Sequence, residues 1–165
     1  MNYSTYIKKF AFPPEFQAPT QLTYEDLVAQ PLTRNDLKAD MEAVNSSLEI
    51  IRKTRGGSWP SEEVTEEFDL LDLAWHEREF RDSDSFAYVV YDNNDRYIGC
   101  FYLYPMGHRT ELTEELLDYD IDASWWVTTS VYELGYYEKL YKAIQEWLKD
   151  FPVKNVYYSN KEIPL

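Results

Sequence analysis

The sequence is poor in the residues that build disulfides and metal sites. Cys100 is its single cysteine, and His76 and His108 are its two histidines among 165 residues. One cysteine excludes an internal disulfide and a cysteine cluster. Two histidines also argue against a histidine-based zinc site. We therefore expect no metal cofactor.

Basic residues are few in comparison with acidic ones. The chain has 16 Lys and Arg against 30 Asp and Glu, which gives a formal net charge of −14. Proteins that bind nucleic acids need cations to neutralise phosphates, so this balance argues against a nucleic-acid partner. The acidity could instead attract a cationic small molecule, although solubility alone explains most of it.

Long apolar runs are absent as well. No segment approaches the roughly 20 apolar residues of a membrane-spanning helix, and the N-terminus has no run typical of a signal peptide. These absences favour a cytoplasmic protein with no membrane partner. Residues 1–22 are rich in Pro, Tyr and Phe and predict an extended arm, because proline lacks an amide donor. Residues 23–165 then form a single domain.

The sequence is rich in aromatic residues, at 17%, and in periodic apolar positions. Apolar spacing distinguishes helices from strands, and Asn, Asp, Gly and Pro mark their ends. Ser61 is the expected cap of the second helix, whose wide apolar stripe predicts packing on more than one side. The expected elements are a strand at 27–32, helices at 34–53 and 61–80, a β-hairpin at 85–104, a strand at 123–129, a helix at 133–151 and a strand at 155–160.

This order of elements determines the fold class. The last helix joins two strands by a crossover, and such crossovers give parallel strands in nearly every case. The hairpin and the strand after it form an antiparallel meander. We therefore expect an α/β fold with a mixed, mainly antiparallel sheet and helices on both faces.

The stretch SWWVTTSVYELGYYEKLYKAI, residues 124–144, predicts a strand, a turn and a helix, the layout of a phosphate-binding site. Phosphate-binding turns usually carry several glycines, whereas this one has a single glycine, Gly135. Together with the element order and the stretches DLAWHEREF, SFAYVVYD and YIGCFYLYP, it resembles the GNAT superfamily of acyl-CoA N-acyltransferases over about residues 26–160. The closest likeness is to a short group of acetyltransferase-like proteins.

The resemblance implies acetyl-CoA as the co-substrate. Its pyrophosphate would lie at the turn, and its pantetheine chain would run beside the strand before the turn. The residues assigned to it in this way are Trp126, Val127, Thr128, Gly135, Tyr136, Tyr137 and Lys139. The family usually adds a helix and a hairpin after the last strand, so we expect a C-terminally shortened GNAT-like sheet. Its open final strand could pair with a second copy in a homodimer.

Two residues are candidate general bases. Asp122 precedes the SWWV strand, where the superfamily often places a carboxylate, although a solvated charge in the acidic run DYDID is the simpler reading. Histidine is the side chain that ordinarily titrates near neutrality, so His76 could act as a base, although a structural role is common for such a histidine. A hydrogen bond to Glu79, three residues on, could raise the pKa of His76.

The leading hypothesis is an N-acetyltransferase that moves an acetyl group from acetyl-CoA to a small amine by direct attack. The alternative is a non-catalytic GNAT-like module with a degenerate CoA loop, which binds a ligand or a protein. A single glycine does not distinguish the two.

Overall fold

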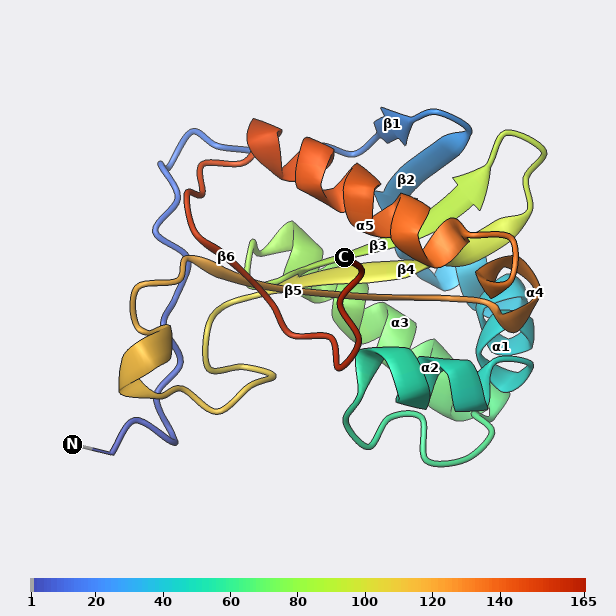
Figure 1. Cartoon of the computed structure of the whole chain (residues 1–165), viewed down its shortest axis with the longest axis horizontal. Coiled ribbons are helices and arrows are strands. Elements are labelled where there is room, and N and C mark those ends of the chain that lie inside the picture. The colour runs from blue at the N-terminus through green and yellow to red at the C-terminus, as the bar shows by residue number, and fades with distance from the viewer. Residues whose placement is uncertain (1) are drawn as a thin grey trace.

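The computed structural model describes residues 2–165, which form one sheet with the strand order β1-β2-β3-β4-β5-β6 (Figure 1). Neighbouring strands are antiparallel, apart from the parallel pair β5 and β6. The strands are β1 (Leu22–Tyr24), β2 (Leu27–Pro31), β3 (Phe86–Asp92), β4 (Tyr97–Tyr104), β5 (Ile121–Val127) and β6 (Val156–Tyr158). The mixed, mainly antiparallel sheet is therefore confirmed.

The helices cover both faces of this sheet, as expected. Figure 1 shows α5 on one face and α1, α2 and α3 on the other. The α-helices are α1 (Leu37–Asn45), α2 (Leu48–Arg55), α3 (Glu66–Arg81), α4 (Thr129–Tyr132) and α5 (Tyr136–Trp147). Short 3-10 turns are η1 (Arg34–Asp36), η2 (Glu114–Leu116) and η3 (Leu148–Asp150).

The expected continuous helix over 34–53 is wrong, because the chain breaks at Ser46 and Ser47. The Ser46 hydroxyl donates to the carbonyl of Ala43 at 3.1 Å. The Ser47 hydroxyl accepts from the amide of Thr129 at 3.0 Å. Serine side chains that bond to the backbone in this way compete with helical hydrogen bonds. The break lets α2 turn towards β5.

The start and the surface of α3 also differ from expectation. Thr65, not Ser61, caps the helix, and its side chain accepts from the amide of Phe68 at 3.1 Å. The expected stripe is not covered on its outer side, because Phe68, Leu71 and Trp75 are 54%, 67% and 57% exposed. The residues that α3 buries are instead largely polar, namely Asp69, Leu73, His76 and Glu79.

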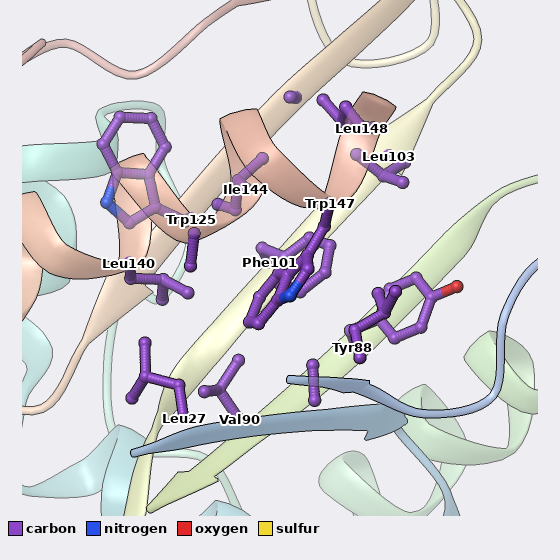
Figure 2. Close-up of a cluster of buried hydrophobic side chains, with 14 of the residues drawn as sticks. Leu27, Tyr88, Val90, Phe101, Leu103, Trp125, Leu140, Ile144, Trp147 and Leu148 are labelled. Carbon is purple, nitrogen blue, oxygen red and sulfur yellow. The ribbon is translucent and has the colours of Figure 1, made fainter. Parts of the chain in front are cut away.

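The face of the sheet under α5 holds an aromatic and aliphatic core (Figure 2). Trp147 of α5 stacks on Phe101 of β4, with ring centroids 5.5 Å apart. Trp125 of β5 is fully buried and stacks on Tyr137 and Tyr141 at 5.0 and 4.9 Å. Burial of this much apolar surface is the main source of stability for the fold.

The opposite face packs against α1, α2 and α3. Trp126 lies in this second core, on the other side of the sheet from Trp125, as the alternation of a strand requires. Its indole nitrogen donates to the hydroxyl of Tyr102 at 2.8 Å. This face buries fewer large apolar side chains and more polar ones than the first.

The two terminal segments lie along the sheet. Residue Lys8 forms an isolated bridge with Met106, and Phe10 stacks on Phe86 with centroids 5.6 Å apart. At the other end, β6 is an edge strand, and the pairing of two copies through it stays a prediction. Over residues 2–165, no helix has both the length and the apolar character to cross a bilayer.

Candidate functional site

A cavity of about 240 Å³ lies on the face of the sheet that packs against α1, α2 and α3. Its floor is β4, its walls are α2, α3 and the loop after α2, and we call it the α3 cavity. Aromatic rings line it, as in many small-ligand sites, together with more charged and histidine side chains than such sites usually have. The lining residues are Arg55, Trp59, Asp72, Trp75, His76, Glu79, Tyr102, Tyr104 and His108.

His76 projects from the buried side of α3 into this cavity. Its ring is 8% exposed and lies 5.7 Å from the ring of Tyr102. Its Nε2 is 3.6 Å from a carboxylate oxygen of Asp72, one turn earlier. Its Nδ1 is buried and has no hydrogen-bond partner among residues 2–165. Nδ1 therefore has almost no surface open to a ligand, and Nε2 is the ring nitrogen that can accept a proton from the cavity.

Glu79 and Arg55 line the same cavity but form no ion pair with each other. Both side chains are 8% exposed. Across the described chain, no salt bridge involves either of them, and the expected hydrogen bond between Glu79 and His76 is not formed. Arg55 uses one donor, Nε, to Ser124 Oγ at 3.2 Å. Buried charges are normally paired, so this cavity holds charges that are left free.

Asp122 lies on β5 behind the α3 cavity and does not line it. It is fully buried. Its carboxylate accepts a short hydrogen bond from the Ser159 hydroxyl and one from Thr110 Oγ1 at 3.1 Å. Burial raises the pKa of Asp122, while the Ser159 hydrogen bond and the charge of Arg109 oppose this rise. The two candidate bases therefore occupy different surroundings, and His76 is the one that faces open space.

The junction between β5 and α5 keeps a free helix start. Gly135 caps α5 in the left-handed region at φ 86°, which favours glycine. A Cβ placed there would meet nothing within 4 Å in the described chain. The first amides of a helix have no intrahelical acceptor, and no side chain of the described residues caps them. This helix start therefore fits an anionic group such as a diphosphate.

The polar ends of Tyr136 and Lys139 turn away from that opening. The Tyr136 hydroxyl donates to Asp26 in the β1–β2 turn. The ammonium of Lys139 makes a short ion pair with Asp26, and Glu25 lies 3.4 Å from it. A cation already held between two carboxylates has little freedom to move to a phosphate.

The edge of β5 is closed beyond its last pair with β6. That pair joins Ala123 to Tyr158, and Ser159 N then donates to the carbonyl of Ala123 at 3.0 Å. Further on, the Asn160 amide replaces a neighbouring strand. Its Oδ1 accepts from Trp125 N at 3.0 Å, and its Nδ2 donates to Trp125 O at 2.9 Å.

The segment after Asn160 stays in this position through α2 and α5. Lys161 N and Glu162 N donate to the carbonyls of Arg55 and Thr54, at 3.1 and 3.0 Å. The phenol of Tyr137 lies beneath the segment, where it accepts from Asn160 Nδ2 at 2.7 Å and donates to the carbonyl of Glu162. Figure 1 shows this end of the chain between α2 and α5. We call residues 159–162 the tail plug.

Backbone direction separates the three residues expected beside pantetheine. Successive strand residues point their N–H and C=O groups to opposite neighbours. Trp125 directs its groups to Asn160, while Thr128 N donates to Ile98 O of the neighbouring strand at 2.9 Å. By this alternation, Val127 faces the same open edge as Trp125, and Trp126 faces β4. Of the three, Val127 has the direction that an added strand requires.

The residues present therefore fit the diphosphate of acetyl-CoA, whereas the position of its acyl end is covered by the chain itself. The start of α5 suits the diphosphate. The backbone groups of Trp125, where the chain would meet the acyl end, are occupied by the tail plug.

Comparison with known proteins shows the fold. No protein-family model matches the sequence, and no curated protein matches it. Solved structures do match: an acetyltransferase of the GNAT family from Bacillus anthracis has 13% identity and a TM-score of 0.56 over 82% of this chain and 70% of its own. RimL, a ribosomal L7/L12 alpha-N-protein acetyltransferase in complex with coenzyme A, has 11% identity and a TM-score of 0.56 over 79% and 66%.

A third match is a spermidine N-acetyltransferase chimera of SpeG from Vibrio cholerae and hSSAT. It has 16% identity and a TM-score of 0.52 over 80% of this chain and 69% of its own. This chain thus spans about two thirds of the length of these structures. The chain has the GNAT fold, which confirms the expected resemblance at the level of architecture, and its structural neighbours are acetyltransferases.

Arg55 was missed in the sequence, because it ends a helix before two glycines, which is a common position for a solvated cation. Glu79 was considered only as a hydrogen-bond partner of His76, three residues before it. The bonds of Asn160 to Trp125 could not be found from the sequence, because they depend on where β6 leaves β5.

Proposed function

We propose that this protein is an acyl-CoA N-acyltransferase that acetylates a small amine in the α3 cavity. The observation that supports the proposal most is that Glu79 and Arg55, neither in a salt bridge within residues 2–165, line one cavity together with His76 in a GNAT fold. Structural cores rarely leave several such groups free. The setting we propose is the cytoplasm.

The α3 cavity supplies positioning and a proton acceptor. Tyr102, Tyr104 and Trp75 provide walls for the apolar part of the amine. Glu79 attracts its positive charge, and His76 Nε2, the ring nitrogen that is not buried, takes the proton that the amine must lose before its lone pair can attack. Acetyl-CoA, when bound, supplies the acyl group as a reactive thioester. Positioning of the two reactants supplies much of the remaining rate.

In this proposal the co-substrate lies along the β5 edge and the start of α5. The contacts we assign to it are the backbone of Val127 and the amides near Gly135, Tyr136 and Tyr137. We leave Lys139 out because Asp26 and Glu25 hold its ammonium. The tail plug must move aside for the acyl end to reach Trp125.

The tail plug also favours a second candidate, a non-catalytic ligand-binding module. Asn160 satisfies both backbone groups of Trp125 without any ligand. A groove closed permanently in this way would leave the α3 cavity as a binding site alone. The two candidates differ in whether CoA can displace the tail plug.

Calorimetric titration with acetyl-CoA and CoA tests this difference. In Asn160→Ala the competing amide is lost, so we expect acetyl-CoA to bind at least about tenfold more tightly than to the wild type. Asn94→Ala, an exposed asparagine in the β3–β4 turn, should bind like the wild type. Circular dichroism must show that each variant is folded. If neither the wild type nor Asn160→Ala binds acetyl-CoA at millimolar concentration, the transferase proposal is wrong.

A thiol-release assay across a panel of amines then tests the chemistry. We expect His76→Gln to lower kcat by about 10²–10⁴-fold, because the proton acceptor is lost. Its affinity for acetyl-CoA should be unchanged. An unchanged kcat would remove His76 from the mechanism.

A further inference from the structure

The α3 cavity carries free charges of both signs. On the α2 side, Arg55 lies with its guanidinium carbon 4.4 Å from the ring centre of Tyr102 and 5.9 Å from that of Trp59. Its terminal nitrogens make no hydrogen bond with residues 2–165, and one nitrogen, Nε, bonds to Ser124. The protein has 30 acidic side chains, and none of those in the described chain forms a salt bridge with this guanidinium.

A second guanidinium strengthens the positive potential on this side. Arg109 donates to the carbonyls of Arg55, Gly56 and Ser159 at 2.9, 3.2 and 3.0 Å. Burial and the nearby charge of Arg55 lower the pKa of Arg109 to about 10, so it remains a cation near neutrality. An adjoining cavity of about 310 Å³ lies between Arg55, Gly57 and Arg109 and continues the α3 cavity to the surface.

The α3 side of the same cavity carries the opposite charge. Glu79 is 8% exposed and has no donor among the described side chains. Asp72 lies 3.6 Å from His76 Nε2 and is partly exposed. The ring of Tyr102 lies near both sides, 5.7 Å from the His76 ring and 4.4 Å from the guanidinium carbon of Arg55. A ligand with one charge would satisfy one side and leave the other unpaired.

We propose that the acceptor is an amine that also carries an anionic oxygen group, a carboxylate or a phosphate. Arg55 binds the anionic group through its free terminal nitrogens, since a planar guanidinium matches two oxygens at once. Glu79 and His76 bind the amine. This assignment rests on the proposed function, because the ligand is an acceptor only if the protein is a transferase. The inference that the ligand binds depends on the residues of the α3 cavity alone.

The α3 cavity by itself favours a small ligand, while the adjoining cavity gives room beyond Arg55. A cavity of about 240 Å³ is smaller than the roughly 300–1,000 Å³ of typical drug-sized sites. It suits a molecule with the dimensions of an amino acid and a short aliphatic or aromatic body against Trp59 and Tyr102. A long polyamine would have to extend past Arg55 and meet its charge.

Intrinsic tryptophan fluorescence and calorimetry can test the proposal without CoA, because Trp59 and Trp75 line the cavity. The probes are ω-amino acids from glycine to 6-aminohexanoate, each with its matched amine and matched acid, for example hexylamine and hexanoate. O-phosphoethanolamine against ethanolamine separates phosphate from carboxylate. We expect at least one doubly charged probe to bind about tenfold more tightly than both singly charged relatives.

Variants assign the two charges. Arg55→Gln should lower the affinity for the doubly charged probe about tenfold or more and leave the affinity for the matched amine unchanged. Glu79→Gln should leave the affinity for the matched acid unchanged. Arg81→Gln and Glu67→Gln on α3 are exposed controls of the same type, and they should change the affinity for neither probe. Melting curves confirm that each variant is folded.

The outcomes separate this inference from the proposed function. If amines without an anionic group bind as tightly as the doubly charged probes, or if Arg55→Gln binds all probes like the wild type, the inference is wrong. Acetyl transfer to such simple amines would then still support the transferase. Tight binding of a doubly charged probe with no transfer from acetyl-CoA would keep the inference and overturn the transferase.

Discussion

The two faces of the sheet are built from different chemistry. Under α5, the buried side chains are apolar or aromatic, with Trp125, Trp147 and Phe101 at the centre. The face under α1, α2 and α3 also buries a set of ionisable groups. These are Asp36, Asp40, Arg55, Asp69, His76, Glu79 and Asp122.

The difference concerns the cost of burying each kind of group. Apolar burial stabilises a fold at little electrostatic cost. Buried charges lose hydration, and each must be compensated by a partner, a proton or a ligand. The α5 face therefore holds the chain together. The opposite face loses stability to buried charges, and we propose that those in the α3 cavity serve binding.

One residue type allows the comparison to be tested directly. Trp147 on α5 is 4% exposed, whereas Trp75 on α3 is 57% exposed and lines the α3 cavity. We expect Trp147→Ala to lower the free energy of unfolding by about 3–5 kcal/mol, because a large ring leaves a packed core. We expect Trp75→Ala to change it by about 1 kcal/mol or less, since it loses a contact with Arg78 and little burial.

Urea denaturation of both variants measures these free energies. A similar loss for both would contradict the division of roles between the faces. Trp75→Ala should in addition weaken ligand binding in the α3 cavity, while Trp147→Ala, where folded, should not.

A second prediction concerns a buried pair of carboxyl groups on the charged face. Asp40 of α1 and Asp69 of α3 are 4% and 1% exposed, and the Tyr97 hydroxyl donates to Asp40. Burial, and then the neighbouring carboxylate, raise the pKa of Asp40 well above its usual value. Asp69, with its own pKa raised by burial, has one buried oxygen without a partner in the described chain.

The raised pKa sets the sign of the pH dependence. The folded state holds a proton that the unfolded state releases near pH 4. The contribution of Asp40 to stability is therefore complete below that pH and is lost as the pH rises through the folded-state pKa. Asp40→Asn keeps the shape of the side chain without its charge. We therefore expect its free energy of unfolding to exceed that of the wild type by about 1–3 kcal/mol at pH 7.

Denaturation at several pH values checks this expectation. The advantage of Asp40→Asn should shrink as the pH falls towards 4. Glu42→Gln, an exposed change on the same helix, should show no such trend. An Asp40→Asn variant that is less stable than the wild type at pH 7 would mean that the charge is compensated.

The apolar face and the strands β2 to β6 could be predicted from the sequence, whereas the short strand β1 was not expected. The hairpin from Phe86 to Tyr104 and the stripe of α5 follow from local periodicity, which depends on nearby residues alone. The break at Ser46 and Ser47 could not be predicted in the same way. It depends on Thr129, which is distant in sequence and donates to Ser47.

The candidate site was predictable only in part. His76 stood out by residue type, and the structure places it in the α3 cavity. Arg55, Glu79 and Asn160 matter because three separate elements converge, and no single-sequence pattern records that convergence. Pattern reasoning also placed the exposed residues Phe68 and Leu71 of α3 in a covered stripe, since it cannot distinguish a buried face from an outer one.

The smallest expected effect concerns the edge of the apolar face. The Lys139 ammonium and the Asp26 carboxylate are 27% and 25% exposed. Partly exposed ion pairs contribute little, so Lys139→Gln should lower the free energy of unfolding by about 1 kcal/mol or less. Because Asp26 already holds the ammonium, the affinity for CoA should stay the same. A loss of about tenfold in calorimetry would instead mean that Lys139 leaves Asp26 for a phosphate. In that case α5 would contribute a charged group to binding as well as packing to stability. The division of roles between the two faces would then not hold for the first turn of α5.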